Sequence, residues 1–128
     1  MNNTSSRRPA ATEFAPYYNT YVTLVPNGDV LATLAQQGRE TQTLLRALDE
    51  KKSLHRYAPG KWSIREVVGH MSDTERVFTY RALRFARADA TPLPGFDQDV
   101  WAKTTNANDQ TLVSLLDDFQ ALRAATLT

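Results

Sequence analysis

The sequence predicts an all-α protein, a bundle of long helices. Apolar residues recur at the 3.6-residue spacing of a helix in three long stretches, and no stretch shows the alternation typical of a strand. One stretch also carries a complete helix start signal, described below. With 128 residues, 41% of them hydrophobic and 23% charged, the chain is large enough for one folded domain with a buried core.

The composition also limits which kinds of partner and which cellular location we expect. The 15 basic and 14 acidic residues leave a net charge of +1, so we expect no nucleic-acid partner and no binding to an anionic membrane. No apolar run is long enough to span a membrane, and no hydrophobic stretch follows Arg7 and Arg8 as it would in an export signal. We therefore expect a cytoplasmic protein. The absence of cysteine excludes disulfide bonds and thiolate chemistry from the chain itself.

The first part of the chain predicts a tail and an arm. Residues 1–13 are mostly small and polar, and we expect a disordered tail there. Between Phe14 and Pro26 the sequence is dense in aromatic and aliphatic residues, more than an unattached tail would tolerate. We therefore expect an extended arm, packed along the outside of a helical domain that comprises residues 14–128.

The first long helix is predicted to begin after Asp29, a good N-cap that follows a turn at residues 26–28. It should run to about Lys52, because lysines in a last turn suit the negative end of the helix dipole. A loop over residues 53–61 should follow. The apolar face of this helix comprises Val30, Leu31, Leu34, Leu44, Leu45 and Leu48.

The second helix has the clearest start signal in the chain. Ser63 and Glu66 form the S-x-x-E pattern of a capping box, and Trp62 can pack against Val67 as a hydrophobic staple. The helix should last to about Asp89. Its buried stripe comprises Ile64, Val67, Val68, Met71, Phe78, Ala82 and Phe85.

A long link and a third helix complete the predicted bundle. Residues 92–108 form a connection that is longer than most bundle loops, and such loops are often functional. The third helix should begin near Asp109. Its apolar face comprises Leu112, Val113, Leu115, Leu116, Phe119 and Leu122.

The second helix carries the first candidate site. Glu66, His70 and Asp73 fall within an arc of about 60° on one side of this helix. They could be a ligand cluster, or a histidine oriented by carboxylates, with Asp73 as a candidate catalytic residue. The alternative is a half-buried histidine that is hydrogen-bonded to Glu66, with Asp73 in solvent. A single helix rarely offers three ligands in a tetrahedral arrangement.

Two further groups also allow a functional and a structural interpretation. Arg65, Arg76 and Arg87 recur every 11 residues along one helical line, where they could bind phosphates or form a solvated face paired with acidic residues. Asp97 and Asp99 lie between aromatic residues in the long link. They could enter a pocket as ligands or as a general base, and so are candidate catalytic residues, or they could cap a short turn.

The segment from Tyr57 to Arg76, with its Trp-Ser-Ile-Arg-Glu and Gly-His motifs, resembles the DinB-like family of metal-binding helical bundles. Residues 81–87 and 92–101 resemble it as well, so the resemblance covers nearly the whole chain after residue 14. It implies an up-and-down four-helix bundle in which three histidines hold a divalent metal, often zinc or nickel. The first of these corresponds to His70, and the other two form an H-x-x-x-H pair on the fourth helix.

The resemblance implies an activity as well as a fold. Family members include metal-dependent S-transferases and isomerases that use low-molecular-weight thiols. Other members are described only as hydrolases. This chain lacks the H-x-x-x-H pair, and its other histidine, His55, matches no ligand of the family. We therefore expect about three of the four helices, an incomplete metal site, and a chain that is inactive at this length.

Two functions stay open on this basis. The first is a metal-dependent enzyme acting on a small molecule such as a low-molecular-weight thiol. The second is a non-catalytic helical interaction module whose open apolar groove leads to self-association, as a homodimer or a helix-swapped oligomer. The near-neutral net charge disfavours a third, nucleic-acid binding through the arginine line.

Overall fold

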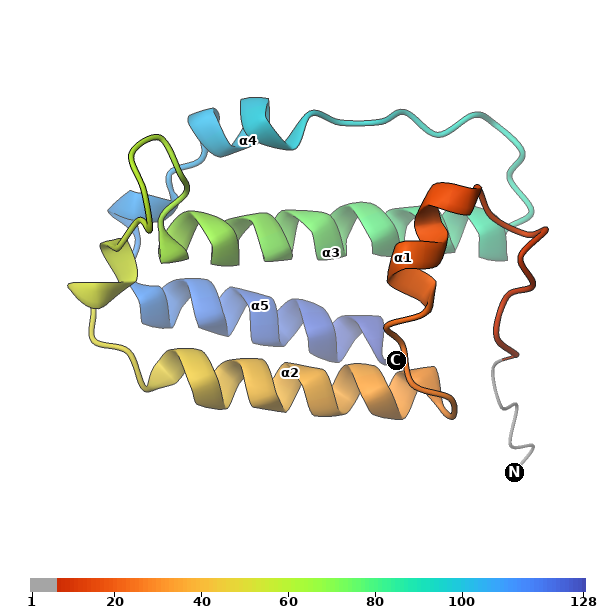
Figure 1. Cartoon of the computed structure of the whole chain (residues 1–128), viewed down its shortest axis with the longest axis horizontal. Helices are drawn as coiled ribbons and strands as arrows, with labels where there is room; N and C mark the ends of the chain where they lie inside the picture. The colour runs from red at the N-terminus through yellow and green to blue at the C-terminus, as the bar shows by residue number, and fades with distance from the viewer. Residues whose placement is uncertain (1–6) are drawn as a thin grey trace.

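The computed structural model describes residues 7–128, and within that range the chain forms helices and no strand (Figure 1). Three long helices form its body: α2 (Val30–Arg46), α3 (Ile64–Ala86) and α5 (Leu112–Thr126). Of these, α5 packs against both α2 and α3. The predicted all-α bundle is therefore confirmed. None of the described helices is both long enough and apolar enough to cross a membrane.

The long helices do not all alternate in direction. Figure 1 shows that α2 and α3 run antiparallel, whereas α3 and α5 run in the same direction. The chain returns along the outside of the bundle between α3 and α5, and this return contains α4 (Gln98–Thr104) and the 3₁₀ turn η3 (Ala107–Asp109). The predicted long link exists, but part of it is helical.

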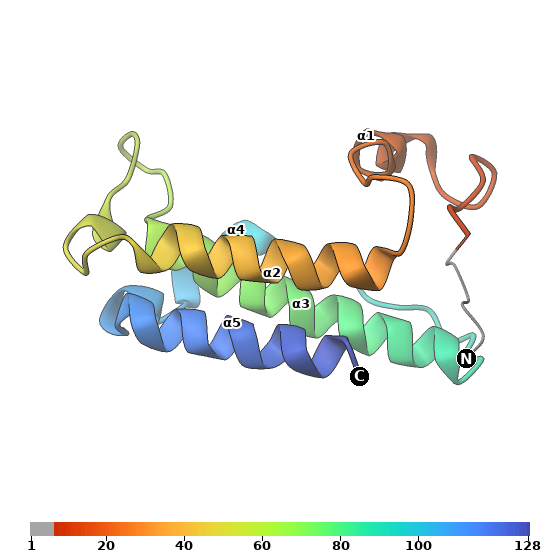
Figure 2. The ribbon, with the colours of Figure 1, turned by 90° about the horizontal axis from the view of Figure 1, so that it is seen from below.

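The core lies where α5 meets its two neighbours. Val68 of α3 and Leu112 and Leu116 of α5 are completely buried, and Leu45 and Leu48 pack against them from the side of α2. No residue of α2 itself is buried, because this helix has a neighbour along one side only. Figure 2 shows the three helices side by side, with α1 standing away from them.

The end of α2 corrects one prediction. This helix ends at Arg46 and not near Lys52. The following residues turn inward, so that a Glu50 carboxylate oxygen accepts hydrogen bonds from Arg65 at 2.7 Å and from the Leu112 backbone at 2.8 Å. These bonds to distant parts of the chain outweigh the local preference to continue the helix, and they leave room for a second 3₁₀ turn, η2 (Lys52–Leu54).

The predicted capping box at the start of α3 is confirmed. The Ser63 hydroxyl accepts from the Glu66 backbone N–H at 3.1 Å, and the Glu66 carboxylate accepts from the Ser63 N–H at 2.7 Å. The helix ends at Ala86, slightly before the predicted Asp89, because Ala88 adopts a positive φ of 52°. The third long helix begins at Leu112 rather than near Asp109, since Thr111 is its N-cap.

The N-terminal arm is helical and not extended, which corrects a second prediction. A 3₁₀ turn, η1 (Pro16–Tyr18), leads into the short helix α1 (Asn19–Val22). Pro16 stands at the first position of the turn, where its fixed φ suits a helix start. No residue of η1 or α1 is buried, so the arm is not packed along the domain. Residues 1–6 of the predicted tail lie outside the described residues.

Candidate functional site

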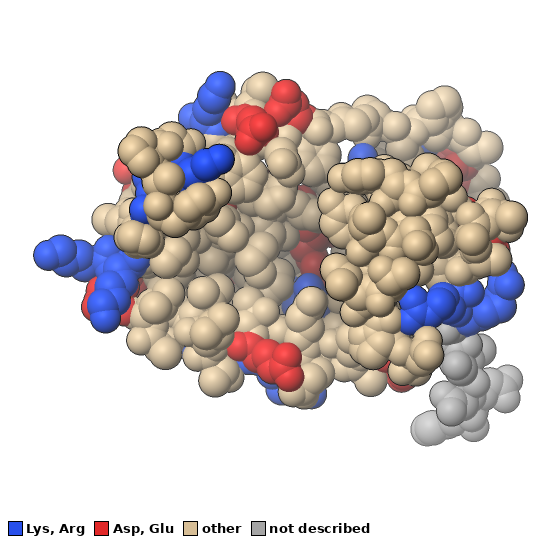
Figure 3. Space-filling model, in the orientation of Figure 1, with Lys and Arg blue, Asp and Glu red and all other residues tan. Residues whose placement is uncertain are grey.

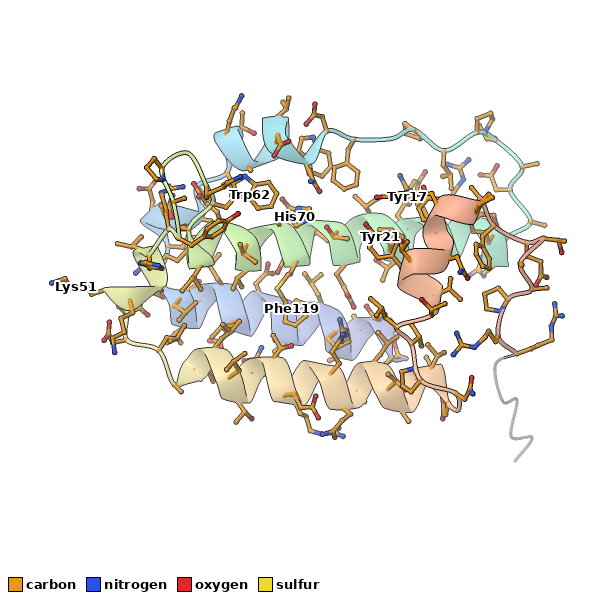
Figure 4. The ribbon with its side chains drawn as sticks, viewed as in Figure 1. Tyr17, Tyr21, Lys51, Trp62, His70 and Phe119 are labelled. Carbon is orange, nitrogen blue, oxygen red and sulfur yellow. The ribbon has the colours of Figure 1, made fainter. Side chains whose placement is uncertain are left out.

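His70 lies in the first half of α3, half-buried and beside the indole of Trp62. The two ring centroids are 5.0 Å apart and the planes are inclined by 59° (Figure 4). One helical turn further on, the Thr74 hydroxyl oxygen lies 3.5 Å from His70 Nε2. The imidazole therefore has an aromatic wall on one side and a hydroxyl near one ring nitrogen.

The start of α3 holds Trp62 against this ring. Glu66 accepts hydrogen bonds from Arg56 at 2.6 and 3.1 Å and from the Asn108 amide at 2.8 Å, in addition to the Ser63 backbone bond. Burial of the Glu66 carboxylate acts to raise its pKa, but these donors outweigh burial and hold the pKa below its ordinary value. The carboxylate thus joins residues 56–63 to the return between α3 and α5.

The predicted cluster on one face of α3 does not form. Glu66 bonds to Arg56, Ser63 and Asn108 and makes no hydrogen bond to His70. The four hydrogen bonds that the Glu66 carboxylate accepts hold it at the start of α3, whereas His70 lies one helical turn further on. Asp73 is half-exposed, and its nearest charged partner is Arg76 at 3.9 Å. The predicted half-buried histidine is confirmed, but its predicted bond to Glu66 is wrong.

The arginine line is a structural feature. The Arg65 side chain is only 10% exposed, and it donates to Ser53, to the Glu50 carboxylate and to two backbone carbonyls of the return. Arg76 Nη2 donates to both carboxylate oxygens of Asp118 of α5, at 2.8 and 3.0 Å. Since two of its members point at different protein partners, the line does not form a common surface for phosphates.

The two aspartates of the return have different environments. Asp97 is the N-cap of α4, and one of its oxygens accepts from the backbone N–H groups of Asp99 and Val100 at 2.9 and 3.1 Å. Asp97 thus adopts the predicted structural role of a cap. Asp99, in the first turn of α4, is exposed, and its carboxylate makes no hydrogen bond within the described chain.

A pocket of about 770 Å³ lies at this end of the molecule, where α2, α3, α4 and the loop before α3 converge. Its lining is largely aliphatic, and it also includes His55, Lys61, Trp62 and Asp99. Its volume lies within the range of small-molecule sites, roughly 300–1,000 Å³. The aliphatic part of the lining comprises Leu44, Leu45, Ile64, Val67, Val68 and Met71.

Large apolar side chains stay exposed on the same side of the bundle. Leu44 of α2 is 71% exposed, and Val67 and Phe78 of α3 are 42% and 58% exposed. With Met71, which shares their side of α3 by helical spacing, they form what we call the apolar face. Figure 3 shows this side of the molecule as a broad area with few charged residues.

The described residues do not by themselves fit a metal ion. From residue 7 to residue 128, no three histidine, aspartate or glutamate side chains lie close enough together to bind one. His55 lines the pocket, and no carboxylate bonds to His70. A protein zinc site normally takes at least three such ligands.

Two functional features were not predicted from the sequence. The ring of Trp62 lies beside the imidazole of His70, a contact that the sequence did not indicate, and Trp62 lines the same pocket as Val67, its predicted staple partner. Arg65 was expected on a solvated or phosphate-binding line, but it is buried at the junction of three segments. The four-residue spacing of His70 and Thr74 was a usable signal, because such pairs are neighbours on a helix.

Comparison with known proteins gives two matches. The family model of the DinB superfamily matches residues 33–128. A protein of Oceanobacillus iheyensis (strain DSM 14371), whose name reads "Putative metal-dependent hydrolase", is 32% identical over 74 residues. These residues make up 56% of this chain and 42% of the relative, so the chain spans less than half the length of that protein. No solved structure matches the chain significantly.

Proposed function

The chain belongs to the DinB superfamily, and on that premise we propose that it supplies His70 as one ligand of a divalent metal ion in a metal-dependent enzyme. The metal is zinc or nickel, and the reaction is of the hydrolase or the thiol S-transferase type. The name of the Oceanobacillus relative supports the metal and the hydrolase type. The family resemblance supports the thiol type, with a low-molecular-weight thiol as the substrate.

One observation carries this proposal, namely the environment of the His70 imidazole ring. It is held in place by Trp62, yet its only hydrogen-bond neighbour in the described chain is the Thr74 hydroxyl at 3.5 Å, which is a long contact. Buried polar groups are usually satisfied by a partner, and the partly buried His70 ring has only this long contact within the described chain. A ring that is positioned but nearly unpaired is suited to donate a lone pair to a ligand.

The remaining ligands in this proposal come from groups outside the described residues. One imidazole binds a metal ion too weakly to retain it, since structural and catalytic zinc sites use three or four protein ligands. The described residues alone are therefore inactive. The pocket beside Trp62 would take the small-molecule substrate.

Among the three candidate carboxylates, Asp99 is the one we propose to act on a substrate. Asp97 is engaged in capping α4, and Asp73 lies beside Arg76. Asp99 lines the pocket together with Trp62, and its carboxylate is free of hydrogen bonds in the described chain. It could orient a substrate or accept a proton there.

Adding one donor beside His70 tests whether the number of ligands limits metal binding. Thr74→His places a second imidazole four residues along, where the native hydroxyl already lies 3.5 Å from Nε2. We expect the purified native chain to hold well under one equivalent of zinc or nickel. Thr74→His should bind nickel at least about tenfold more tightly, because two imidazoles on one helix side act as a chelate. Isothermal titration measures the affinity, and elemental analysis measures the content.

Two controls make the result decisive. His70→Ala combined with Thr74→His should lose the gain, whereas His55→Ala combined with Thr74→His should keep it. A native chain that holds one equivalent of metal, unchanged by His70→Ala, would contradict the proposal. So would an equal gain in the presence and absence of His70.

The exposed apolar face favours a second candidate function, a non-catalytic helical module that binds another helix or another copy of itself. Contiguous exposed apolar surface is rare on monomeric proteins and is typical of interaction sites. Leu44 provides such a surface on α2, and Val67 and Phe78 provide it on α3. The oligomeric state in solution tests this candidate.

A further inference from the structure

The segment from Arg8 to Asn27 is a self-contained unit. Its backbone hydrogen bonds, such as Thr23 to Asn19 and Leu24 to Tyr21, stay within the segment. The Arg8 guanidinium donates to the Val22 carbonyl at 2.6 Å, and it also donates to the Val25 carbonyl and the Asn27 side chain. No hydrogen bond of the described chain joins this segment to residues 28–128. Its own side chains therefore hold it together.

The connection to the bundle can act as a hinge. Gly28 has a φ of +130°, a conformation that other residues rarely adopt, and no atom lies within 4 Å of the place where its Cβ would be. Neither α1 nor the turn η1 packs closely against a long helix. Rotation at this residue breaks no hydrogen bond between the segment and the rest of the described chain.

The segment exposes two aromatic side chains, Tyr17 and Tyr21. Tyr17 and Tyr21 lie one turn apart, with ring centroids 5.9 Å apart, and they are 66% and 56% exposed. In the view of Figure 4, α1 and the two tyrosines overlie the second half of α3, and Figure 2 shows that α1 stands away from the long helices. That half of α3 carries Phe78 of the apolar face, which is 58% exposed. Two apolar surfaces thus lie across solvent from each other, and their burial is favourable.

We propose that residues 8–27 form a lid, hinged at Gly28, that closes onto the apolar face so that Tyr17 and Tyr21 pack against Phe78. Closure covers the second half of α3 and leaves open the pocket at the other end of the bundle, which is lined by Leu44, Val67 and Trp62. The lid therefore limits the apolar surface available to other molecules without blocking the small-molecule pocket.

Disulfide trapping tests the lid, because the native chain has no cysteine. The trapping variant carries Tyr21→Cys and Phe78→Cys, and the matched control carries Asn19→Cys and Phe78→Cys. Asn19 lies on the opposite side of α1, while the two chain separations are nearly equal, so random-coil closure costs the same in both. We expect the trapping variant to form an intramolecular disulfide about tenfold faster, since the bond requires Cα atoms within about 7 Å.

Peptide mapping by mass spectrometry under dilute, mildly oxidising conditions distinguishes the outcomes. Equal rates in the two variants would overturn the lid, and so would a disulfide-linked dimer as the main product, which would assign this surface to a second copy. Circular dichroism checks that both variants fold. If Tyr21→Cys unfolds the segment, Tyr17→Cys with Phe78→Cys replaces it, with the same expected rate and the same contrary results.

Discussion

Arg65 connects parts of the chain that are far apart in sequence. Its guanidinium reaches the turn after α2, the buried Ser53 and the carbonyls of Asn108 and Gln110, all from a position on the first turn of α3. When all donors of a buried charge are satisfied, removing one of its partners strongly destabilises the folded protein. The loop end of the bundle therefore depends on this side chain.

Replacing Arg65 should destabilise the protein more than replacing any exposed arginine of the same helix. We expect Arg65→Met to lower the free energy of unfolding by about 3 kcal/mol, because Glu50 and two carbonyls lose their donor. Arg76→Met is the matched control, since Arg76 pairs with Asp118 at the surface and should cost at most about 1 kcal/mol. Urea denaturation measures both, and equal losses would contradict the assigned role.

Glu66 gives the stability a dependence on acid. Its pKa in the folded protein is lowered, because the donors from Arg56, Ser63 and Asn108 outweigh the effect of burial. The contribution of Glu66 to stability is therefore complete above the ordinary glutamate pKa of about 4.3 and is lost as the pH falls through the lower, folded value. Glu66→Gln should flatten the decline of stability below about pH 5. If the stability of the native chain and that of Glu66→Gln fell equally with decreasing pH, this prediction would be wrong.

Local signals predicted part of the candidate site. The capping role of Glu66 follows from a spacing of three residues, and the structure confirms it. The partner of Arg65 is Glu50, on another element, so no spacing within α3 could indicate it. The packing of Trp62 on His70 reaches across the helix start, where the direction of a side chain depends on the whole loop.

At the scale of the elements, backbone conformation sets the shape of the loop that precedes α3. Gly60 has a φ of +74° in the turn before Trp62, and an added Cβ would meet no atom there within 4 Å. Gly95, in the return, likewise has open space around it but no positive φ. The two glycines thus differ in conformation and not in crowding.

This difference gives a controlled test of the loop. Gly60→Ala should lower the free energy of unfolding by about 1 kcal/mol, because an L side chain is strained in the left-handed region. Gly95→Ala should be neutral or slightly stabilising, since it reduces the freedom of the unfolded chain. Thermal unfolding of both variants measures this, and an equal change in the two would show that the positive φ has no cost.

Element starts were predictable from sequence and element ends were less so. Asp29 caps α2 and Ser63 caps α3 as predicted, because a cap is a contact between residues three apart. The end of α2 depends on the hydrogen bonds that Glu50 accepts from Arg65 and Leu112. The helical conformation of the arm depends on Pro16 in the first turn of η1. Where tertiary bonds compete with local preference, the sequence pattern alone extends a helix too far.

For the whole molecule, the open side of the bundle is the dominant feature. The long helices share a core on one side only, and the apolar face stays exposed on the other. The helical periodicity predicted that Val67, Phe78 and Phe85 are buried in this chain, and that prediction is wrong, because they are 42%, 58% and 74% exposed. The periodicity also could not predict that α3 and α5 run in the same direction. That arrangement depends on the course of the return, which carries no periodic signal.

We expect the chain to associate with itself through the part of the apolar face near the pocket. Light scattering coupled to gel filtration should give a concentration-dependent mass. Val67→Glu should shift the chain toward monomer, because it places a charge in the contact. Val113→Glu is the control, since Val113 is 52% exposed on α5 and does not line the pocket. A monomer at all concentrations, or an equal effect of both substitutions, would exclude this association.

The tilted contact between the rings of Trp62 and His70 has a practical consequence. Excited indoles are quenched by a neighbouring charged imidazole or by a bound transition-metal ion, and the two ring centroids are only 5.0 Å apart. The chain has one other tryptophan, Trp101, so Trp101→Phe would leave a single emitter. The light emitted by such a variant would report on the histidine directly, in solution and without any added dye.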